Sequence, residues 1–175
     1  IKKNGSHFCF VEDLDFNSNK GSISAYKITP SGYEAIGVVL EEDFHLSFPF
    51  IFEYENEIFM CPETHEKKEI RLYKCIDFPG KWEFHTTLMK NVSAADTIIF
   101  KNKDRWWLLT NIDQSCVADH GCQLHIFSSN NPMSDEWIAH ENNPVIFDPL
   151  IARNGGLILS DNEIYRVFQR QGFDM

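Results

Sequence analysis

The sequence has too little positive charge to bind polyanions. It holds 16 Lys and Arg against 26 Asp and Glu, which gives a formal net charge of −10 at pH 7. A field of this sign repels nucleic acid phosphates and anionic lipid head groups. We therefore expect no nucleic acid partner and no attachment to a membrane surface.

Long apolar runs are also missing. No segment approaches the ~20 consecutive apolar residues that cross a bilayer, so we expect no membrane span. No signal peptide is visible, although the chain begins with Ile1 rather than Met.

Cysteine is scarce, and its spacing is wide. Five cysteines are an odd number that does not make a disulfide framework: Cys9, Cys61, Cys75, Cys116 and Cys122. A Cys116–Cys122 bridge stays open if the protein is secreted. Cys116, His120 and Cys122 read as half a metal site that lacks a fourth ligand, so we predict no metal and no cofactor. Free-looking cysteines without a visible signal favour a cytoplasmic location.

Helical periodicity is absent as well. Hydrophobic residues make up 43% of the chain and aromatics 14%, with fifteen Phe, in short runs bounded by Gly, Pro, Asn and Asp. Such runs are typical of strands joined by turns. The composition predicts an all-β globular domain.

A repeat of roughly 50 residues organises these strands. Each repeat has a polar turn, an aromatic-rich strand and a closing polar residue, in the segments Asn4–Glu12, Glu55–Glu63, Lys103–Asn111 and Asp161–Gln169. A short apolar strand precedes the turn, and two further strands follow. Four strands in this order form the blade of a β-propeller. A β-sandwich is the alternative, but it does not need the same aromatic strand and closing residue in every unit.

At this period the chain holds about three and a half blades of a propeller. We predict a partial blade over residues 1–47, full blades over 48–95 and 96–152, and a partial blade over 153–175. We expect the chain to lack the opening strand of the first blade and the closing blades. Open blade edges invite pairing with another chain, so they are candidate contacts for an oligomer.

Polar residues recur at the predicted channel mouth. The innermost strands begin at Phe48, Asp96 and Asn154, with Arg153 beside Asn154, and the second strands close on a ring of Glu12, Glu63, Asn111 and Gln169. Converging carboxylates are what glycoside chemistry needs, and amides match sugar hydroxyls. We assign Asp96 and Glu63 as candidate catalytic residues. The candidate substrate-binding residues are Arg153, Glu12, Asn111, Gln169 and Asn154.

Each of these residues also has a plainer interpretation. Asp96 could accept backbone hydrogen bonds at a strand end, and Glu63 could be a solvated strand end. Glu12 could belong to an ordinary exposed loop, and Arg153 could cap a strand or pair with a carboxylate.

Long motifs on these strands resemble one family. They are His45–Thr64, Glu69–Glu83, Asn91–Phe100, Arg105–Asn111, Asn142–Val145 and Ala152–Asp174. Together they are similar to the five-bladed propeller domain at the N-terminal side of plant glucosamine inositolphosphorylceramide transferases and in bacterial proteins of polysaccharide-assembly loci. The resemblance implies five blades, with Ala152–Asp174 in the fourth, and a role in glycan or glycolipid assembly.

The blade layout also resembles glycoside hydrolase families 43 and 32. That resemblance implies a base or nucleophile Asp opening the first blade, a supporting Asp opening the third and an acid Glu opening the fourth. Asp96 matches the supporting Asp, the first-blade position falls before Ile1, and the fourth-blade position aligns with Arg153. A guanidinium is a poor proton donor, so the hydrolase set is broken at the acid. Arg153 fits a phosphate or carboxylate better.

Three functions follow as hypotheses. The leading one is a carbohydrate-handling domain that binds a sugar or sugar phosphate at the channel mouth, with a covalently linked or separate transferase domain as partner. The second is a family 43-like glycoside hydrolase, with Glu63 as the best available acid. The third is a non-catalytic scaffold for a glycosyltransferase, which predicts an exposed apolar patch on a blade face instead of a polar pocket.

Overall fold

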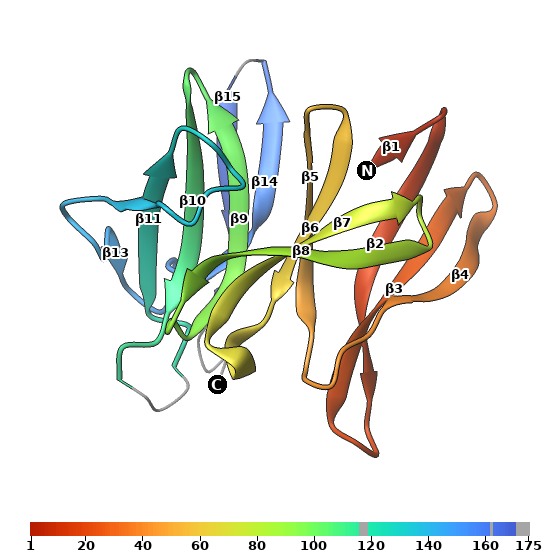
Figure 1. Cartoon of the computed structure of the whole chain (residues 1–175), viewed down its shortest axis with the longest axis horizontal. Helices are drawn as coiled ribbons and strands as arrows, with labels where there is room; N and C mark the ends of the chain where they lie inside the picture. Colours follow the sequence, from red (N-terminus) through yellow and green to blue (C-terminus); the bar gives the residue numbers. More distant parts are fainter. Residues whose placement is uncertain (116–118, 162, 171–175) are drawn as a thin grey trace.

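Antiparallel strands make up nearly all of the regular structure. The computed structural model describes residues 1–115, 119–161 and 163–170, which form fifteen strands and one short 3₁₀ turn, η1 (His65–Lys67) (Figure 1). Within these residues no helix is long and apolar enough to span a membrane.

The strands form four sheets, and each sheet is filled in chain order. The first sheet is β1 (Lys2–Lys3), β2 (Ser6–Asp15), β3 (Lys20–Thr29) and β4 (Gly32–Leu40). The second is β5 (Ser47–Tyr54), β6 (Glu57–Glu63), β7 (Glu69–Asp77) and β8 (Lys81–Lys90). The third is β9 (Ala94–Asn102), β10 (Arg105–Ile112), β11 (Gln123–Ser129) and β12 (Ile138–Ala139), with β13 (Ile146–Phe147) also paired to β11. The fourth is β14 (Asn154–Ser160) with β15 (Glu163–Phe168).

Two details differ from the strands expected above. A two-residue strand, β1, pairs with β2 where the opening strand of the first blade was expected to be missing. The single fourth strand expected for each blade is split, in the third sheet, into β12 and β13. Between them the side chain of Asn143 accepts a hydrogen bond from Ile126 N and donates one to Ile126 O, in place of strand pairing.

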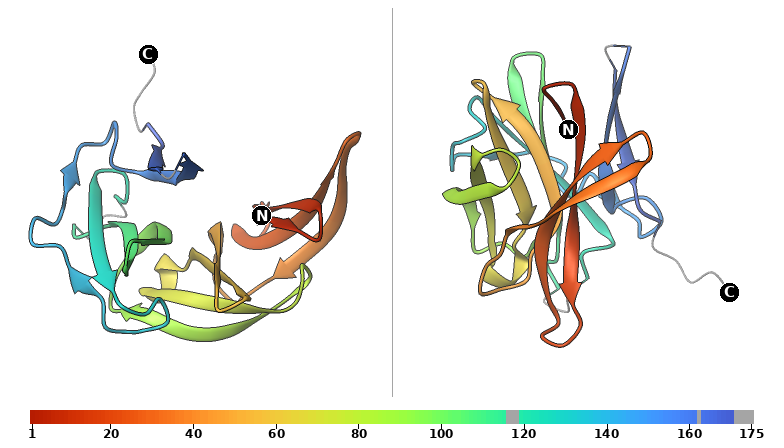
Figure 2. Two further views of the ribbon diagram at one scale, coloured as in Figure 1. Left: turned by 90° about the horizontal axis from the view of Figure 1, so that it is seen from above. Right: turned by 90° about the vertical axis from the view of Figure 1, so that its right-hand side faces the viewer.

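The sheets follow one another around an arc. Seen from above in Figure 2, the first sheet and the β14–β15 hairpin lie at its two ends. The long strands β2, β5, β9 and β14 contact one another in succession along the inner side. Among the described residues the fourth sheet is not hydrogen-bonded to the first, so the sheets do not close a ring.

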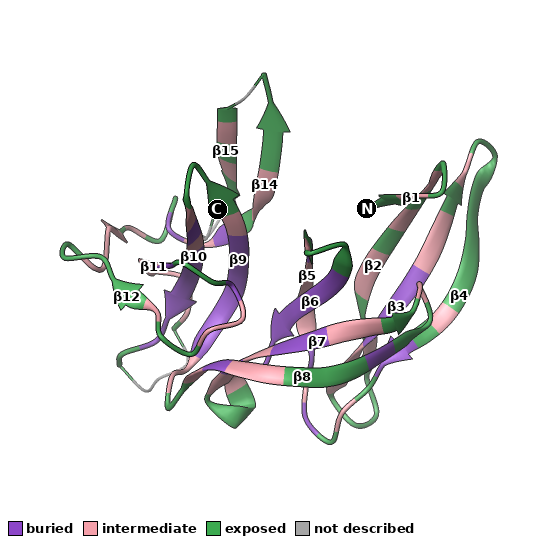
Figure 3. Ribbon diagram, turned by 45° about the horizontal axis from the view of Figure 1, so that its top comes forward, coloured by how far each residue is buried: buried purple, intermediate pink, exposed green. Residues whose placement is uncertain are grey.

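The apolar core lies between neighbouring sheets. Between the second and third sheets, the Trp106 ring lies 5.9 Å from the Phe52 ring and 5.5 Å from the Tyr54 ring. Figure 3 shows buried residues concentrated in β6, β9 and β10, and exposed ones along β4 and β14. Among the described residues the second and third sheets each have a neighbouring sheet on both sides, whereas the first and fourth sheets each have one.

A one-residue bulge interrupts the first long strand of the second, third and fourth sheets at corresponding places. The pairing shifts between Ser47 and Phe50 in β5, opposite Leu109 and Asn111 in β9, and between Asn154 and Gly156 in β14. Bulges re-aim side chains and are over-represented next to active sites. Asp96 lies in the β9 bulge with φ at 51°, a conformation that non-glycine residues rarely adopt. The bulge therefore sets the direction of the Asp96 side chain.

Candidate functional site

An ion pair between Asp96 and Arg153 lies at the centre of the candidate site. Arg153 Nε donates a hydrogen bond to Asp96 Oδ2 at 2.6 Å. Asp96 comes from the bulge of β9, and Arg153 directly precedes β14, so the pair joins the third sheet to the fourth. Asp96 is buried, but the Arg153 side chain retains 32% of its exposure.

Glu63, the last residue of β6, extends this pair towards the second sheet. Its Oε2 accepts a hydrogen bond from the backbone N of Asp96 at 3.4 Å, and its Oε1 lies 2.8 Å from His65 Nδ1. The Glu63 side chain is 9% exposed. The two candidate catalytic carboxylates are therefore neighbours, each with a cationic partner.

The surroundings shift the pKa values of the two carboxyl groups in opposite directions. Burial raises the pKa of Asp96 to about 6, although the Arg153 guanidinium opposes this change. Burial also disfavours ionised Glu63, but the hydrogen bond from His65 and nearby positive charge outweigh it and lower the Glu63 pKa. The same hydrogen bond raises the pKa of His65. Neighbouring groups with separated pKa values are able to take different proton-transfer roles.

Asn111 and Asn154 are wholly buried, and their hydrogen bonds are made within the protein. Asn111 Nδ2 donates to the carbonyls of Gln123 and Ala152, and its Oδ1 accepts from Asn154 N. Asn154 Nδ2 donates to the carbonyls of Asp96 and Leu109. We propose that the two amides position Asp96 and Arg153 instead of contacting a ligand.

Gln169 lies beside the ion pair, just beyond β15. Its Nε2 donates to Asn154 O at 2.7 Å and approaches Asp96 Oδ2 at 3.4 Å. Its backbone N donates to Arg153 O at 2.9 Å. Gln169 thus fixes the backbone around Arg153 and adds a second donor to Asp96.

Glu12 lies at the edge of the group. Its Oε1 is 3.3 Å from His45 Nε2, and its side chain is 38% exposed. Its negative charge is near enough to contribute to the raised pKa of Asp96. Of the seven candidate residues, Glu12 is the one held apart from the shared hydrogen bonds.

A cavity of about 230 Å³ opens beside the ion pair. Its polar lining includes Glu63, Asp119, His120 and Arg153. Arg153 donates through Nε alone, so within the described part of the chain neither of its terminal nitrogens has a hydrogen-bond acceptor. We call this space the arginine cavity.

Sequence reasoning missed the role of two histidines here. His65 bonds to Glu63, and the ring of His120 lies 5.4 Å from that of His65. His65 comes two residues after Glu63, and that spacing was an available signal. His120 lies in the connection between β10 and β11, outside the repeated pattern.

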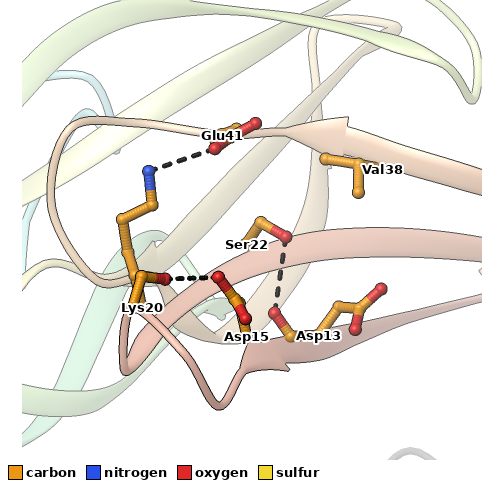
Figure 4. Close-up of a pocket in the computed structure, with 7 residues that line it drawn as sticks. Asp13, Asp15, Lys20, Ser22, Val38 and Glu41 are labelled. Atoms are coloured by element: carbon orange, nitrogen blue, oxygen red, sulfur yellow. Dashed lines mark hydrogen bonds and ion pairs between the residues drawn. The ribbon is translucent and has the colours of Figure 1, made fainter.

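A larger cavity, about 550 Å³, lies on the first sheet, and none of the candidate residues line it (Figure 4). Its carboxylates already have partners: Glu41 pairs with Lys20 at 3.0 Å, and Asp15 accepts hydrogen bonds from Asn17 and Ser18. Size alone therefore does not identify a functional site, and two of the candidate residues, Glu63 and Arg153, line the arginine cavity instead.

The cysteine and metal hypotheses give no second site. Cys122 carries a free thiol, and Cys116 lies outside the described residues. Where the structure is described, no three His, Cys, Asp or Glu side chains are grouped to hold a metal ion.

Solved structures share this fold. A thermostable family-43 glycoside hydrolase matches all of the chain and 75% of its own, with a TM-score of 0.65 at 9% identity. An α-L-arabinanase from Cellvibrio cellulosa matches 95% of the chain and 65% of its own, with a TM-score of 0.67 at 14% identity. At such low identity the likeness shows the fold alone. The chain is an all-β protein that resembles the family 43 propellers.

Two curated relatives are similar in sequence. Glucosamine inositolphosphorylceramide transferase 1 of Oryza sativa subsp. japonica is 34% identical over 164 residues, and that of Arabidopsis thaliana is 34% identical over 170 residues. These alignments cover 91% and 94% of the chain but only 22% of each relative. The family model described as glucosamine inositolphosphorylceramide transferase 1, N-terminal, matches residues 2–174. The chain therefore belongs to the N-terminal family of glucosamine inositolphosphorylceramide transferase 1.

Proposed function

We propose that the arginine cavity binds a sugar or sugar phosphate, and that the domain serves glycan or glycolipid assembly. The observation that carries this proposal is the arrangement of Arg153. Asp96 holds the guanidinium by Nε, while both terminal nitrogens remain available beside the cavity. A guanidinium with two free donors is suited to bidentate contact with a phosphate or carboxylate.

The remaining lining suits sugar hydroxyls. Glu63 supplies a carboxylate that accepts hydrogen bonds, and His120 supplies a ring whose pKa is lowered by burial, which favours the neutral imidazole. A neutral imidazole both donates and accepts. The lining thus combines one cation with several groups that recognise hydroxyls.

Charge in the cavity predicts a pH dependence of anion binding. Asp96 competes for Arg153 while it is ionised, and it loses this charge as the pH falls through about 6. The pKa of His65 is raised, so His65 also gains a positive charge as the pH falls. We expect glucuronic acid, whose carboxylate stays ionised over this range, to bind more tightly at pH 5.5 than at pH 8.

Membership of the family suggests which other domain accompanies this one in the larger protein. The relatives are named as transferases, and the chain spans 22% of their length, so we propose that a transferase domain is linked to it in the larger protein. We retain five blades as the proposed architecture, with blade limits at residues 1–47, 48–95, 96–152 and 153–175. The four sheets that follow one another around the arc support it.

Calorimetric titration with glucosamine 1-phosphate, glucose 1-phosphate and glucuronic acid tests the proposal. Loss of charge-assisted hydrogen bonds costs ~1.5–3 kcal/mol. The variant Arg153→Gln should therefore bind roughly 10- to 100-fold more weakly. Arg170→Gln, at an exposed position, serves as the matched control and should bind as the parent does. Equal binding by the parent and Arg153→Gln would reject the site.

A glycoside hydrolase is the second candidate, favoured by the separated titration of the two carboxyl groups. Asp96, with its pKa near 6, is the better proton donor, and Glu63, with its lowered pKa, is the better base or nucleophile. This reverses the acid role expected for Glu63 from the sequence. Hydrolysis of aryl arabinofuranosides or xylosides that Asp96→Asn abolishes would support this candidate, and unchanged hydrolysis by that variant would reject the role of Asp96.

A scaffold is the third candidate, favoured by apolar surface on the end sheets. A cavity of about 330 Å³ on the first sheet is lined by Cys9, Val11, Tyr26, Ile28 and Tyr33. On the fourth sheet Leu159 is 72% exposed. The apolar cavity on the first sheet shares no lining residue with the arginine cavity, so docking there and ligand binding are compatible.

A further inference from the structure

A second polar cavity adjoins the arginine cavity. It measures about 360 Å³, and its lining includes His65, Lys68, Asn91, Ser93 and His120. We call it the histidine cavity. Its lining residues are all polar or charged, and they include the carboxylates of Glu66 and Asp113 as well as the Lys68 ammonium.

His120 belongs to both cavities. It lines the arginine cavity on one side and the histidine cavity on the other, and its Nε2 lies 2.9 Å from Ser93 Oγ. The ring of His65, which lines the histidine cavity, lies 5.4 Å from the ring of His120. The two cavities therefore meet at His120.

The far end of the histidine cavity offers unused polar groups. Lys68 and Asn91 both adopt left-handed backbone conformations, with φ of 53° and 58°, and the hydrogen bond from Val92 N to Lys68 O links their turns. Both residues are exposed, and within the described residues their side chains make no hydrogen bond or ion pair. The turns thus hold one cation and one amide next to each other at the cavity.

We propose that one ligand spans both cavities, with its phosphate at Arg153 and a further sugar unit past His120 at Lys68 and Asn91. This inference rests on the proposed function and names the substrate class: a phosphorylated saccharide of at least two sugar units. A single sugar phosphate fills the arginine cavity and leaves the histidine cavity to water. Binding a second unit adds hydrogen bonds from the Lys68 ammonium and the Asn91 amide.

The test compares ligands of one and two units on the whole chain. Glucose 1-phosphate and glucosamine 1-phosphate are titrated beside the 1-phosphates of maltose, cellobiose and chitobiose. We expect at least one disaccharide phosphate to bind tenfold or more tightly than its monosaccharide counterpart. In ¹H–¹⁵N spectra that ligand should shift the amides of Lys68, Asn91 and Ser93, which the monosaccharides leave in place.

Variants separate this inference from the proposed function. Lys68→Gln should remove most of the disaccharide advantage while leaving monosaccharide binding unchanged, and Lys90→Gln, at an exposed position on β8, is the matched control. If monosaccharide phosphates bind and no disaccharide phosphate binds more tightly, the two-unit ligand is rejected and the proposed function stands. If no phosphorylated sugar binds, the proposed function itself fails.

Discussion

Replacing Asp96 by Asn should change how the stability of the protein depends on pH. The Asp96 pKa rises from an ordinary value of 3.8 to about 6 on folding, chiefly because the carboxyl is buried. The folded state then binds more protons than the unfolded state between these values, so this group lowers stability as the pH rises through them. The full effect amounts to ~3 kcal/mol, because one pH unit of separation is worth about 1.4 kcal/mol.

Asn has nearly the same shape, accepts a left-handed φ and cannot ionise. Its cost is an unpaired Arg153, which we set at about 1 kcal/mol because that side chain is one third exposed to water. The Asp96 pKa of about 6 already includes the attraction of Arg153 to the ionised carboxylate, so this cost does not enter the pH dependence a second time. Relative to the parent, Asp96→Asn should therefore gain ~3 kcal/mol of unfolding free energy between pH 4 and pH 8.

Urea denaturation at half-unit pH intervals measures this difference directly. Asp104→Asn, at the exposed turn between β9 and β10, is the matched control and should follow the parent throughout. Parallel curves for the parent and Asp96→Asn across pH 4–8 would refute the assignment of a raised pKa to buried Asp96. A relative gain in the opposite direction would mean that Arg153 holds the carboxylate ionised.

Two further predictions concern the framework of the site. Asn154→Ala should lower the unfolding free energy by roughly 2–4 kcal/mol, because it leaves buried carbonyls without donors; exposed Asn142→Ala should cost under ~0.5 kcal/mol in the same urea titration. Gly21→Ala should destabilise by ~1–3 kcal/mol, because its Cβ would clash with the backbone oxygen of Leu46. Gly80→Ala, where a Cβ meets no atom within 4 Å, is its control in thermal unfolding, and equal melting temperatures would contradict the crowding at Gly21.

The repeat explains how much of the site could be predicted from the sequence. A fixed period places equivalent residues at equivalent points of successive sheets, so the spacing alone aligns Asp96 with Asn154. The structure places both at bulges, and Asn154 Nδ2 donates to Asp96 O. The all-β class could be predicted from the short apolar runs bounded by turn residues, because that assignment needs only local strand and turn signals.

What the sequence did not predict depends on contacts outside the repeat. His120 comes from the connection between β10 and β11, and its position beside His65 depends on how that connection returns to the sheet. The burial of Asn111 could not be predicted from the sequence either, because a polar residue at a strand end is exposed in one packing of the sheets and buried in another. The splitting of the outer strand depends on Asn143 bonding to Ile126, a contact across 17 residues.

The most direct test of the account is a crystal structure of the chain with glucosamine 1-phosphate, grown at pH 5.5. We predict the phosphate within hydrogen-bond distance of the terminal nitrogens of Arg153 and the sugar ring against Glu63 and His120. Phosphate bound elsewhere, with the arginine cavity holding only water, would contradict the central claim.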